Sequence, residues 1–339
     1  MHILFYNAKA YDKEFFTQAN QHFQHDIRFV DAKLNIDTVD LINDDEKAIC
    51  LFVNECADRE VMKRLSQVGV QLIALRCAGF NNVDIKAAHE FGITVVRVPA
   101  YSPYAVAEHT LGLMLSLNRK IHRAYNRVRD GNFALDGLLG FDFHGRTAGI
   151  IGTGRIGALV AKLLRGMGMK VVAYDPQHHP DSDALGIHYV SLADLFAQSD
   201  VISLHCPLTP DTHHMIGKQA LQSMKQGAML INTSRGALLD TQAVIHSLKS
   251  KHLGYLGLDV YEQESELFFE DFSCDIIQDD IFERLLTFPN VLITSHQGFF
   301  TKEALQNIAD TTLNNIKQFE KLSIAQQPIE LSNMVTVNA

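Results

Sequence analysis

The chain has 339 residues, of which 47% are hydrophobic, enough for two domains with separate cores. Its formal charge of −9, from 39 acidic and 30 basic side chains, argues against nucleic-acid or anionic-membrane partners and favours small-molecule ligands. The five cysteines are scattered and never in C-x-x-C spacing, so neither a disulfide framework nor a metal site is expected.

The N-terminal stretch "MHILFYNAKAYDKEFF" lacks the basic region and the cleavage site of a signal peptide. The longest apolar runs are well short of the roughly 18 residues that a membrane span requires. We therefore expect a cytoplasmic protein.

Short β-branched and aliphatic runs alternate with helix-length segments along nearly the whole chain. This alternation is typical of α/β folds, in which helices connect parallel strands. In the first hundred residues the expected strands are 2–7, 48–54, 71–78 and 94–99.

After these strands the pattern of short apolar runs gives way to a long helical segment. Ser102 is a good helix N-cap and Pro103 a good first helical residue, and the pattern continues as one long helix to Val128. We interpret this helix as the crossing into a second domain.

A second series of strands is expected at 147–154, 170–175, 188–190, 200–206, 228–234, 255–261 and 290–296. A final helix over 301–322 is compatible with a return to the first domain.

A glycine-rich loop follows the first strand of this second series. Gly152, Gly154 and Gly157 have G-x-G-x-x-G spacing and stand at the start of a helix. Such glycines permit a tight turn, the approach of a pyrophosphate, and close packing of helix on strand. Asp175 ends the next strand at the spacing expected for the acid that holds a ribose 2′-hydroxyl, although by itself it could be a turn residue before Pro176. No arginine or lysine follows in "DPQHH" to receive a 2′-phosphate, so NAD is favoured over NADP.

Polar residues also collect where four other expected strands end. Ligands of open parallel sheets bind at the carboxyl ends of the strands, so we expect these residues to face one crevice beside the glycine loop. The residues concerned are His205, Cys206, Pro207, Thr233, Ser234, Arg235, Asp259, Glu262, Glu264 and His296.

An arginine, a histidine and a carboxylate beside a nicotinamide indicate hydride transfer to a 2-oxo acid. The guanidinium fork of Arg235 can hold a carboxylate, and a histidine such as His296 can supply a proton near neutral pH. A carboxylate on the other ring nitrogen would orient the imidazole. Each residue could also have a purely structural role. His296 is one of 16 histidines, most of which would be structural or on the surface, and Glu264 lies in an acid-rich stretch typical of a solvated face. Arg235 could form an ion pair with Asp240.

Several motifs resemble, in order and spacing, the NAD-dependent D-2-hydroxyacid dehydrogenases: "GTGRIG", "HCPLTPDT", "NTSRGALLD", "GLDVYEQE" and "SHQGFFT". Others, among them "ALRCAGFNNVD" and "VVRVPAYSPYAVAEH", are similar more narrowly to the bacterial fermentative D-lactate dehydrogenases. The resemblance extends over essentially the whole chain. One departure is Thr153, at a loop position that is often leucine in the family.

The resemblance implies a role for individual residues. The catalytic residues would be Arg235, Glu264 (rather than Glu262) and His296. The cofactor-binding residues would be Gly152, Gly154, Arg155, Ile156, Gly157, Asp175, His205, Cys206, Pro207, Thr212, Thr233, Ser234 and Asp259. The substrate would be bound by Cys77, Ala78, Gly79, Tyr101 and Phe299.

It also implies two Rossmann-like or flavodoxin-like domains with parallel sheets. Residues 1–100 and 299–339 would form a discontinuous substrate domain, into which an NAD-binding domain over 101–298 is inserted. The expected reaction is the reversible reduction of pyruvate to D-lactate by NADH, in a homodimer or homotetramer. A bulkier 2-oxo acid, or an NAD-sensing co-repressor that binds peptides, remains an alternative. Formate or phosphite oxidation is less favoured.

Overall fold

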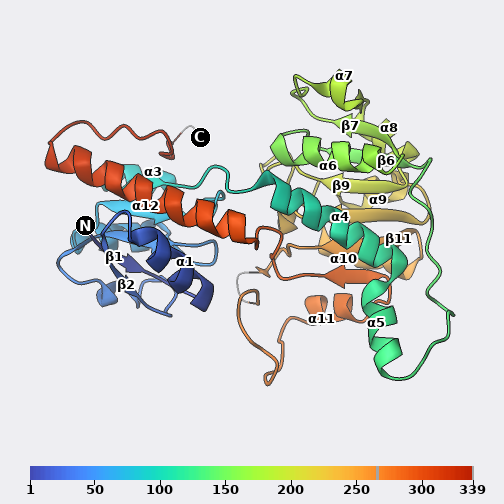
Figure 1. Ribbon diagram of the computed structural model, residues 1–339, viewed down its shortest axis with the longest axis horizontal. Helices are drawn as coiled ribbons and strands as arrows, with labels where there is room; N and C mark the ends of the chain where they lie inside the picture. The colour runs from blue at the N-terminus through green and yellow to red at the C-terminus, as the bar shows by residue number, and fades with distance from the viewer. Residues whose placement is uncertain (265–266, 338–339) are drawn as a thin grey trace. The chain divides into compact units, whose positions relative to one another are not determined.

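The computed structural model describes residues 1–264 and 267–337. They divide into two compact units, each an α/β structure (Figure 1). Unit 1 comprises Met1–Ser102 and Phe299–Ala339, and unit 2 comprises Pro103–Gly298. The predicted α/β fold with two parallel sheets is confirmed.

Unit 1 contains a five-stranded sheet in the order β2-β1-β3-β4-β5, with every neighbouring pair parallel. This is the flavodoxin-like order. The strands are β1 (His2–Phe5), β2 (Asp26–Phe29), β3 (Glu46–Leu51), β4 (Leu72–Leu75) and β5 (Thr94–Val96).

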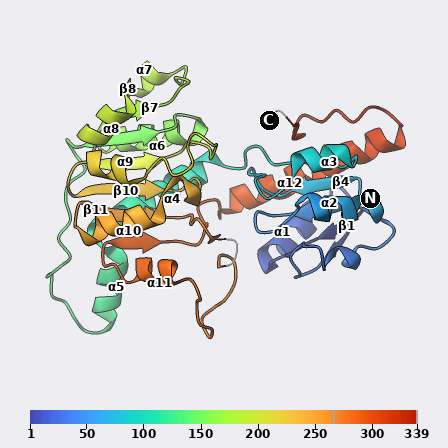
Figure 2. The ribbon, with the colours of Figure 1, turned by 180° about the vertical axis from the view of Figure 1, so that it is seen from behind.

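Helices cover both faces of this sheet. On one face lie α1 (Ala10–Asn20) and α12 (Lys302–Ile324), which pack side by side (Figure 1). The other face carries α2 (Arg59–Gln67) and α3 (Ile85–Glu90) (Figure 2). A short 3-10 helix, η1 (Val39–Leu41), precedes β3. Thus the last helix of the chain covers the same face of the sheet as the first helix and completes this three-layer unit.

Unit 2 contains a seven-stranded parallel sheet in the order β12-β11-β10-β9-β6-β7-β8. The strand order reverses between β6 and β9, and such a switch point is where dinucleotides bind in doubly wound sheets. The strands are β6 (Thr147–Ile151), β7 (Lys170–Tyr174), β8 (His188–Tyr189), β9 (Val201–Leu204), β10 (Ala228–Asn232), β11 (Leu253–Leu258) and β12 (Val291–Ile293).

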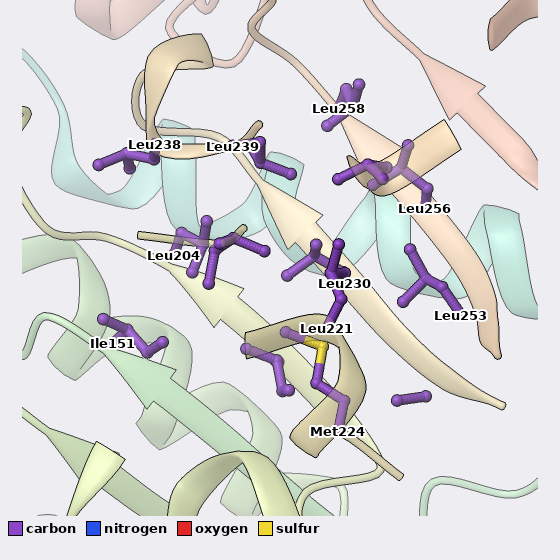
Figure 3. Close-up of a cluster of buried hydrophobic side chains, with 14 of the residues drawn as sticks. Ile151, Leu204, Leu221, Met224, Leu230, Leu238, Leu239, Leu253, Leu256 and Leu258 are labelled. Atoms are coloured by element: carbon purple, nitrogen blue, oxygen red, sulfur yellow. The ribbon is translucent and has the colours of Figure 1, made fainter. Parts of the chain in front are cut away.

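The sheet of unit 2 is also covered on both faces. One face carries α4 (Pro103–Arg119) and α6 (Arg155–Gly166), and the other α8 (Leu192–Gln198), α9 (Lys218–Ser223) and α10 (Thr241–Lys249) (Figures 1 and 2). Figure 3 shows leucines of β9, β10 and β11 packed with side chains of α9 in the buried core under the second face. The remaining helices are α5 (Ile121–Arg129), α7 (Ser182–Leu185), η2 (Gly236–Leu238) and α11 (Asp280–Leu286).

Two expectations about local structure are wrong. The single helix expected from Pro103 to Val128 is interrupted at Lys120, whose φ of 51° is left-handed, so that α4 and α5 are separate helices. The Nζ of Lys120 donates to the carbonyl of Leu139 (2.7 Å), a contact that no local pattern predicts. Strand β2 was not expected, because it has four residues without a clear alternation and pairs only with β1.

No helix in the described part of the chain combines the length and apolar character needed to cross a bilayer.

Candidate active site

The glycine loop lies between β6 and α6, at the switch point of the larger sheet. Gly152 has a φ of 91°, and a Cβ at this position would lie 2.6 Å from the backbone nitrogen of Cys206. A Cβ on Gly157 would collide with the carbonyl oxygen of Gly152. Both positions therefore require glycine, because the loop packs directly against the chain that follows β9 and against itself.

Gly154 is different, because a Cβ there would meet no protein atom within 4 Å. It is the N-cap of α6 and is exposed. The first backbone N–H groups of a helix are unpaired within the helix and attract anions. The open space at Gly154 therefore fits a pyrophosphate approaching the start of α6, and the loop residues Arg155 and Ile156 form its first turn.

Asp175 follows β7 and is held beside the glycine loop. Its Oδ2 accepts hydrogen bonds from the backbone N–H of Thr153 (2.6 Å) and from its hydroxyl (3.2 Å). The same Thr153 hydroxyl is 2.7 Å from the hydroxyl of Tyr189, on which the ring of His178 stacks at 3.7 Å. Thr153 thus connects the carboxylate to β8, a connection that sequence reasoning missed.

The segment after β9 contributes half-buried His205 and buried Cys206. Burial lowers the pKa of His205 to about 3, so this imidazole is neutral at physiological pH. Burial also raises the pKa of the Cys206 thiol to about 11, which keeps it protonated. The hydroxyl of Ser234 donates to the Cys206 carbonyl (2.7 Å) and joins this segment to the end of β10. The ends of β9 and β10 are therefore connected, as expected for one crevice.

Other residues of the predicted cofactor set shape these loops. The hydroxyl of Thr212 donates to the carbonyl of Pro207 (2.7 Å) and closes the turn between them. Thr233 is buried, and its hydroxyl is 2.9 Å from that of Thr110 on α4.

Arg235 lies directly after β10. Buried Asn232 holds the turn, because its amide nitrogen donates to the Arg235 carbonyl (2.8 Å) and its oxygen accepts from the Ser234 N–H (3.0 Å). Within the described residues, the guanidinium makes one hydrogen bond, from Nη1 to the Ser234 carbonyl (2.7 Å), and no ion pair. Asp240 instead caps α10 by accepting from the Ala243 N–H, so the structure does not bear out the alternative pairing of Arg235 with Asp240. The guanidinium is thus available for an anionic ligand.

His296 and Glu264 form a hydrogen-bonded pair. The distance between His296 Nδ1 and Glu264 Oε1 is 2.9 Å, and the side chains are 16% and 20% exposed. The other carboxylate oxygen of Glu264 accepts from the Tyr261 N–H (3.0 Å), which orients the carboxylate. Glu262 points elsewhere and bonds to His214. An acceptor on Nδ1 makes Nε2 the nitrogen that can exchange a proton with a ligand.

Asp259 organises the turn that carries His296. Its buried carboxylate accepts from the Thr294 hydroxyl and from the backbone N–H groups of Gln297 and Gly298, at 2.6 to 2.9 Å. The ring of His109 lies 3.2 Å away. Although burial acts in the opposite direction, the hydrogen bonds from His109 and Thr294 lower the pKa of Asp259. A charged Asp259 therefore anchors the end of β12, where His296 has a left-handed φ of 52°.

The predicted substrate residues belong to unit 1. Cys77, Ala78 and Gly79 follow β4, and this loop is held by hydrogen bonds from Cys77 Sγ to the Gly79 carbonyl (3.2 Å) and from Arg97 to the Ala78 carbonyl (2.9 Å). Phe299 is buried, and the centroid of its ring is 6.1 Å from that of Tyr101. Unit 1 therefore contains a fixed backbone loop at residues 77–79 and an aromatic pair of Tyr101 and Phe299.

Arg76 immediately precedes this loop and was missed from the sequence. It is 2% exposed, its Nε lies 3.4 Å from Asp12 Oδ1, and its Nη2 donates to the Asn7 carbonyl (3.0 Å). The guanidinium also lies over the rings of Phe5 and Phe52. An arginine within the apolar run "LIALRCA" was the available signal, because a buried charge requires partners.

Known proteins share both the sequence and this architecture. The family model "D-isomer specific 2-hydroxyacid dehydrogenase, NAD binding domain" matches residues 111–298. The chain is 53% identical over 321 residues to the D-lactate dehydrogenase of Escherichia coli, covering 95% of this chain and 97% of that protein. The apo structure of the E. coli enzyme superposes with a TM-score of 0.89 at 48% identity, covering 99% of this chain and 100% of that one. A pyruvate reductase of Chlamydomonas reinhardtii gives a TM-score of 0.90 at 45% identity, covering 98% of both chains.

The fold, the glycine loop and the paired histidine and glutamate define a dehydrogenase that uses a dinucleotide. The chain belongs to the D-2-hydroxyacid dehydrogenase family, so the predicted resemblance is confirmed. It is an NAD-dependent oxidoreductase, as the glycine loop and Asp175 predicted.

Proposed function

We propose that this chain is a D-lactate dehydrogenase that reversibly reduces pyruvate with NADH. The observation that carries the proposal is the pair of His296 and Glu264, which follow β12 and β11 of the same parallel sheet whose strands β6 and β10 lead into the glycine loop and Arg235. The relatives named D-lactate dehydrogenase and pyruvate reductase support the choice of substrate.

In the proposed reaction, NADH held by the glycine loop and Asp175 would supply the hydride that reduces the carbonyl carbon of pyruvate. Arg235 binds the substrate carboxylate and polarises the carbonyl through its planar donor fork. Negative charge then develops on the carbonyl oxygen, and His296 gives the proton from Nε2 to produce the hydroxyl group. Glu264 holds the imidazole through Nδ1 and stabilises its cationic form.

From unit 1 we assign the backbone of Cys77, Ala78 and Gly79 to the substrate carboxylate. Tyr101 and Phe299 are assigned to the methyl group of pyruvate, because two large aromatic rings suit a small apolar substituent. From unit 2 we assign Asp175 to the adenosine ribose, and the segments around His205 and Thr233 to the rest of the cofactor.

We further infer a homodimer or homotetramer in the cytoplasm. Ile121, Tyr125 and Val128 on α5 are 54%, 60% and 54% exposed and form one apolar stripe, which suits a subunit contact. All five cysteines are free thiols, and Cys56 and Cys274 are exposed, which suits a reducing compartment.

The substrate is tested by following NADH oxidation with pyruvate, 2-oxobutyrate and 2-oxoisocaproate, and by chiral analysis of the product. We expect the highest kcat/KM with pyruvate and formation of D-lactate. A higher kcat/KM with 2-oxoisocaproate would support the same mechanism but identify a branched-chain 2-oxo acid as the substrate. NADH binding without any turnover would instead favour the co-repressor alternative.

Replacement of Tyr189 with Phe should weaken NADH binding with little change in kcat. The variant loses the hydroxyl that bonds to Thr153, and one such hydrogen bond contributes about 1 kcal/mol, or about fivefold in KM. Steady-state kinetics with NADH and NADPH provides the measurement, and the preference for NADH should also fall. The matched control is Tyr255→Phe in β11. An unchanged KM for NADH in Tyr189→Phe would show that the Tyr189 hydroxyl does not contribute to the orientation of Thr153 and Asp175.

A further inference from the structure

A second cluster of titratable side chains lies in unit 2, apart from the pair of His296 and Glu264. His213 and His214 follow β9 in the loop that leads to α9, and Glu262 follows β11. One ligand atom from each of these three side chains lies within 4.8 Å of the other two. We propose that His213, His214 and Glu262 form a binding site for a divalent transition metal, with zinc as the preferred ion.

The geometry of the cluster is set by its neighbours. The Nε2 of His214 is 2.6 Å from Glu262 Oε1, and the second oxygen of Glu262 accepts from the Thr241 hydroxyl (3.2 Å). The rings of His213 and His214 stack with centroids 3.9 Å apart. The N–H of His214 donates to the Ala237 carbonyl (2.8 Å), which holds the loop in place. The three donors are therefore gathered before any ion arrives.

The donor set matches the chemistry of zinc. Two imidazole nitrogens and one carboxylate oxygen provide three ligands of a tetrahedral site, which leaves one position for water or an external ligand. Imidazole donors favour zinc and its neighbours in the first transition row over magnesium or calcium. The bond from Thr241 would orient the carboxylate of Glu262, as partners of metal ligands usually do.

Binding requires a small rearrangement within the cluster. The ion would take the place of the hydrogen bond between His214 and Glu262, and each imidazole would present a lone pair to it. Protons compete for these lone pairs, so affinity should fall as the solution becomes more acidic. His213 is exposed, and its ring can turn toward the ion at little cost.

The proposed metal site includes a residue of the loop after β11, which also carries Glu264, the partner of His296 in the proposed reaction. Glu262 and Glu264 are two residues apart after β11, and Glu264 contacts His296 whereas Glu262 contacts His214. A bound ion would connect the loop after β9 to the loop that carries Glu264. The inference itself does not depend on the proposed substrate, because metal binding is measured without turnover.

The test is titration of the metal-free full-length protein with Zn²⁺ by calorimetry, and with Co²⁺ by visible absorption. We expect one ion per chain in the wild type. His213→Ala and Glu262→Gln should each weaken binding by more than about 100-fold, because loss of a direct ligand exceeds the roughly 10- to 100-fold effect of losing a group that only hydrogen-bonds to a ligand. The control His178→Ala, from another adjacent histidine pair, should bind as the wild type does.

Thermal unfolding with and without Zn²⁺ provides a second readout. The ion should raise the Tm of the wild type and of His178→Ala but leave that of Glu262→Gln unchanged. No binding by the wild type, or undiminished binding by both ligand variants, would overturn the proposal. A thiolate charge-transfer band in the cobalt spectrum would also overturn it by assigning the ion to a cysteine.

Discussion

Replacement of His296 with Gln is expected to lower kcat for pyruvate reduction by about 10²- to 10⁴-fold, the usual contribution of a positioned general acid. Glutamine is of similar size and can keep a hydrogen bond to Glu264, but it cannot deliver a proton at neutral pH. NADH should still bind, because the glycine loop and Asp175 are formed by β6, β7 and α6. Steady-state kinetics and fluorescence titration of NADH measure the two effects separately.

Glu264→Gln is the companion variant, and its loss in kcat should be smaller. The amide can still bond to Nδ1 of His296, but it carries no charge to stabilise the imidazolium. Glu283→Gln on the exposed side of α11 serves as the matched control, and its kcat should equal that of the wild type. A loss of NADH affinity in His296→Gln as large as its loss in kcat would contradict the assignment of His296 as proton donor.

Replacement of Arg235 with Lys should reduce kcat/KM for pyruvate by about 10- to 100-fold, corresponding to the 1.5–3 kcal/mol of a hydrogen bond to a charged group. An ammonium group is a point charge and cannot reproduce the two parallel bonds of a guanidinium to a carboxylate. Both an increase in KM and a decrease in kcat are expected, since Arg235 is proposed to bind the carboxylate and polarise the carbonyl.

The same substitution should leave the stability of the fold nearly unchanged. Within the described residues Arg235 makes no ion pair, and its one side-chain bond is to the carbonyl of the preceding residue. Chemical denaturation would therefore separate a functional role from a structural one. Arg284→Lys on α11 is the matched control, and wild-type kcat/KM for pyruvate in Arg235→Lys would contradict the proposed role.

Much of the fold was predictable because its signals are local. A buried parallel strand is a short apolar run, and a phosphate-binding turn requires glycine at defined positions. The need for glycine at positions 152 and 157 could be predicted from their spacing, and the structure shows the physical reason for each. The clustering of polar residues at strand ends was also predictable, because the carboxyl ends of parallel strands meet at one edge of a sheet.

Features that depend on contacts distant in sequence could not be predicted in this way. The break at Lys120 is accompanied by a hydrogen bond to Leu139, and buried Arg76 is paired with Asp12 and Asn7. The cluster of His213, His214 and Glu262 joins two loops that are separated by β10 and β11 in the sequence. The spacing of the cysteines gave no reason to expect a metal site, and no spacing rule for metal ligands covers residues on two separate loops.

The two glutamates after β11 illustrate the difference between features that depend on neighbours in the sequence and features that depend on the tertiary structure. By itself the sequence determined the α/β class, the dinucleotide loop with its acid, and a set of candidate residues at strand ends, because each depends on near neighbours in the chain. Both Glu262 and Glu264 were then possible partners of His296, and only resemblance favoured the second. The tertiary structure alone decided the pairing, since it places β12 beside β11 and so brings Glu264, and not Glu262, within 2.9 Å of the imidazole.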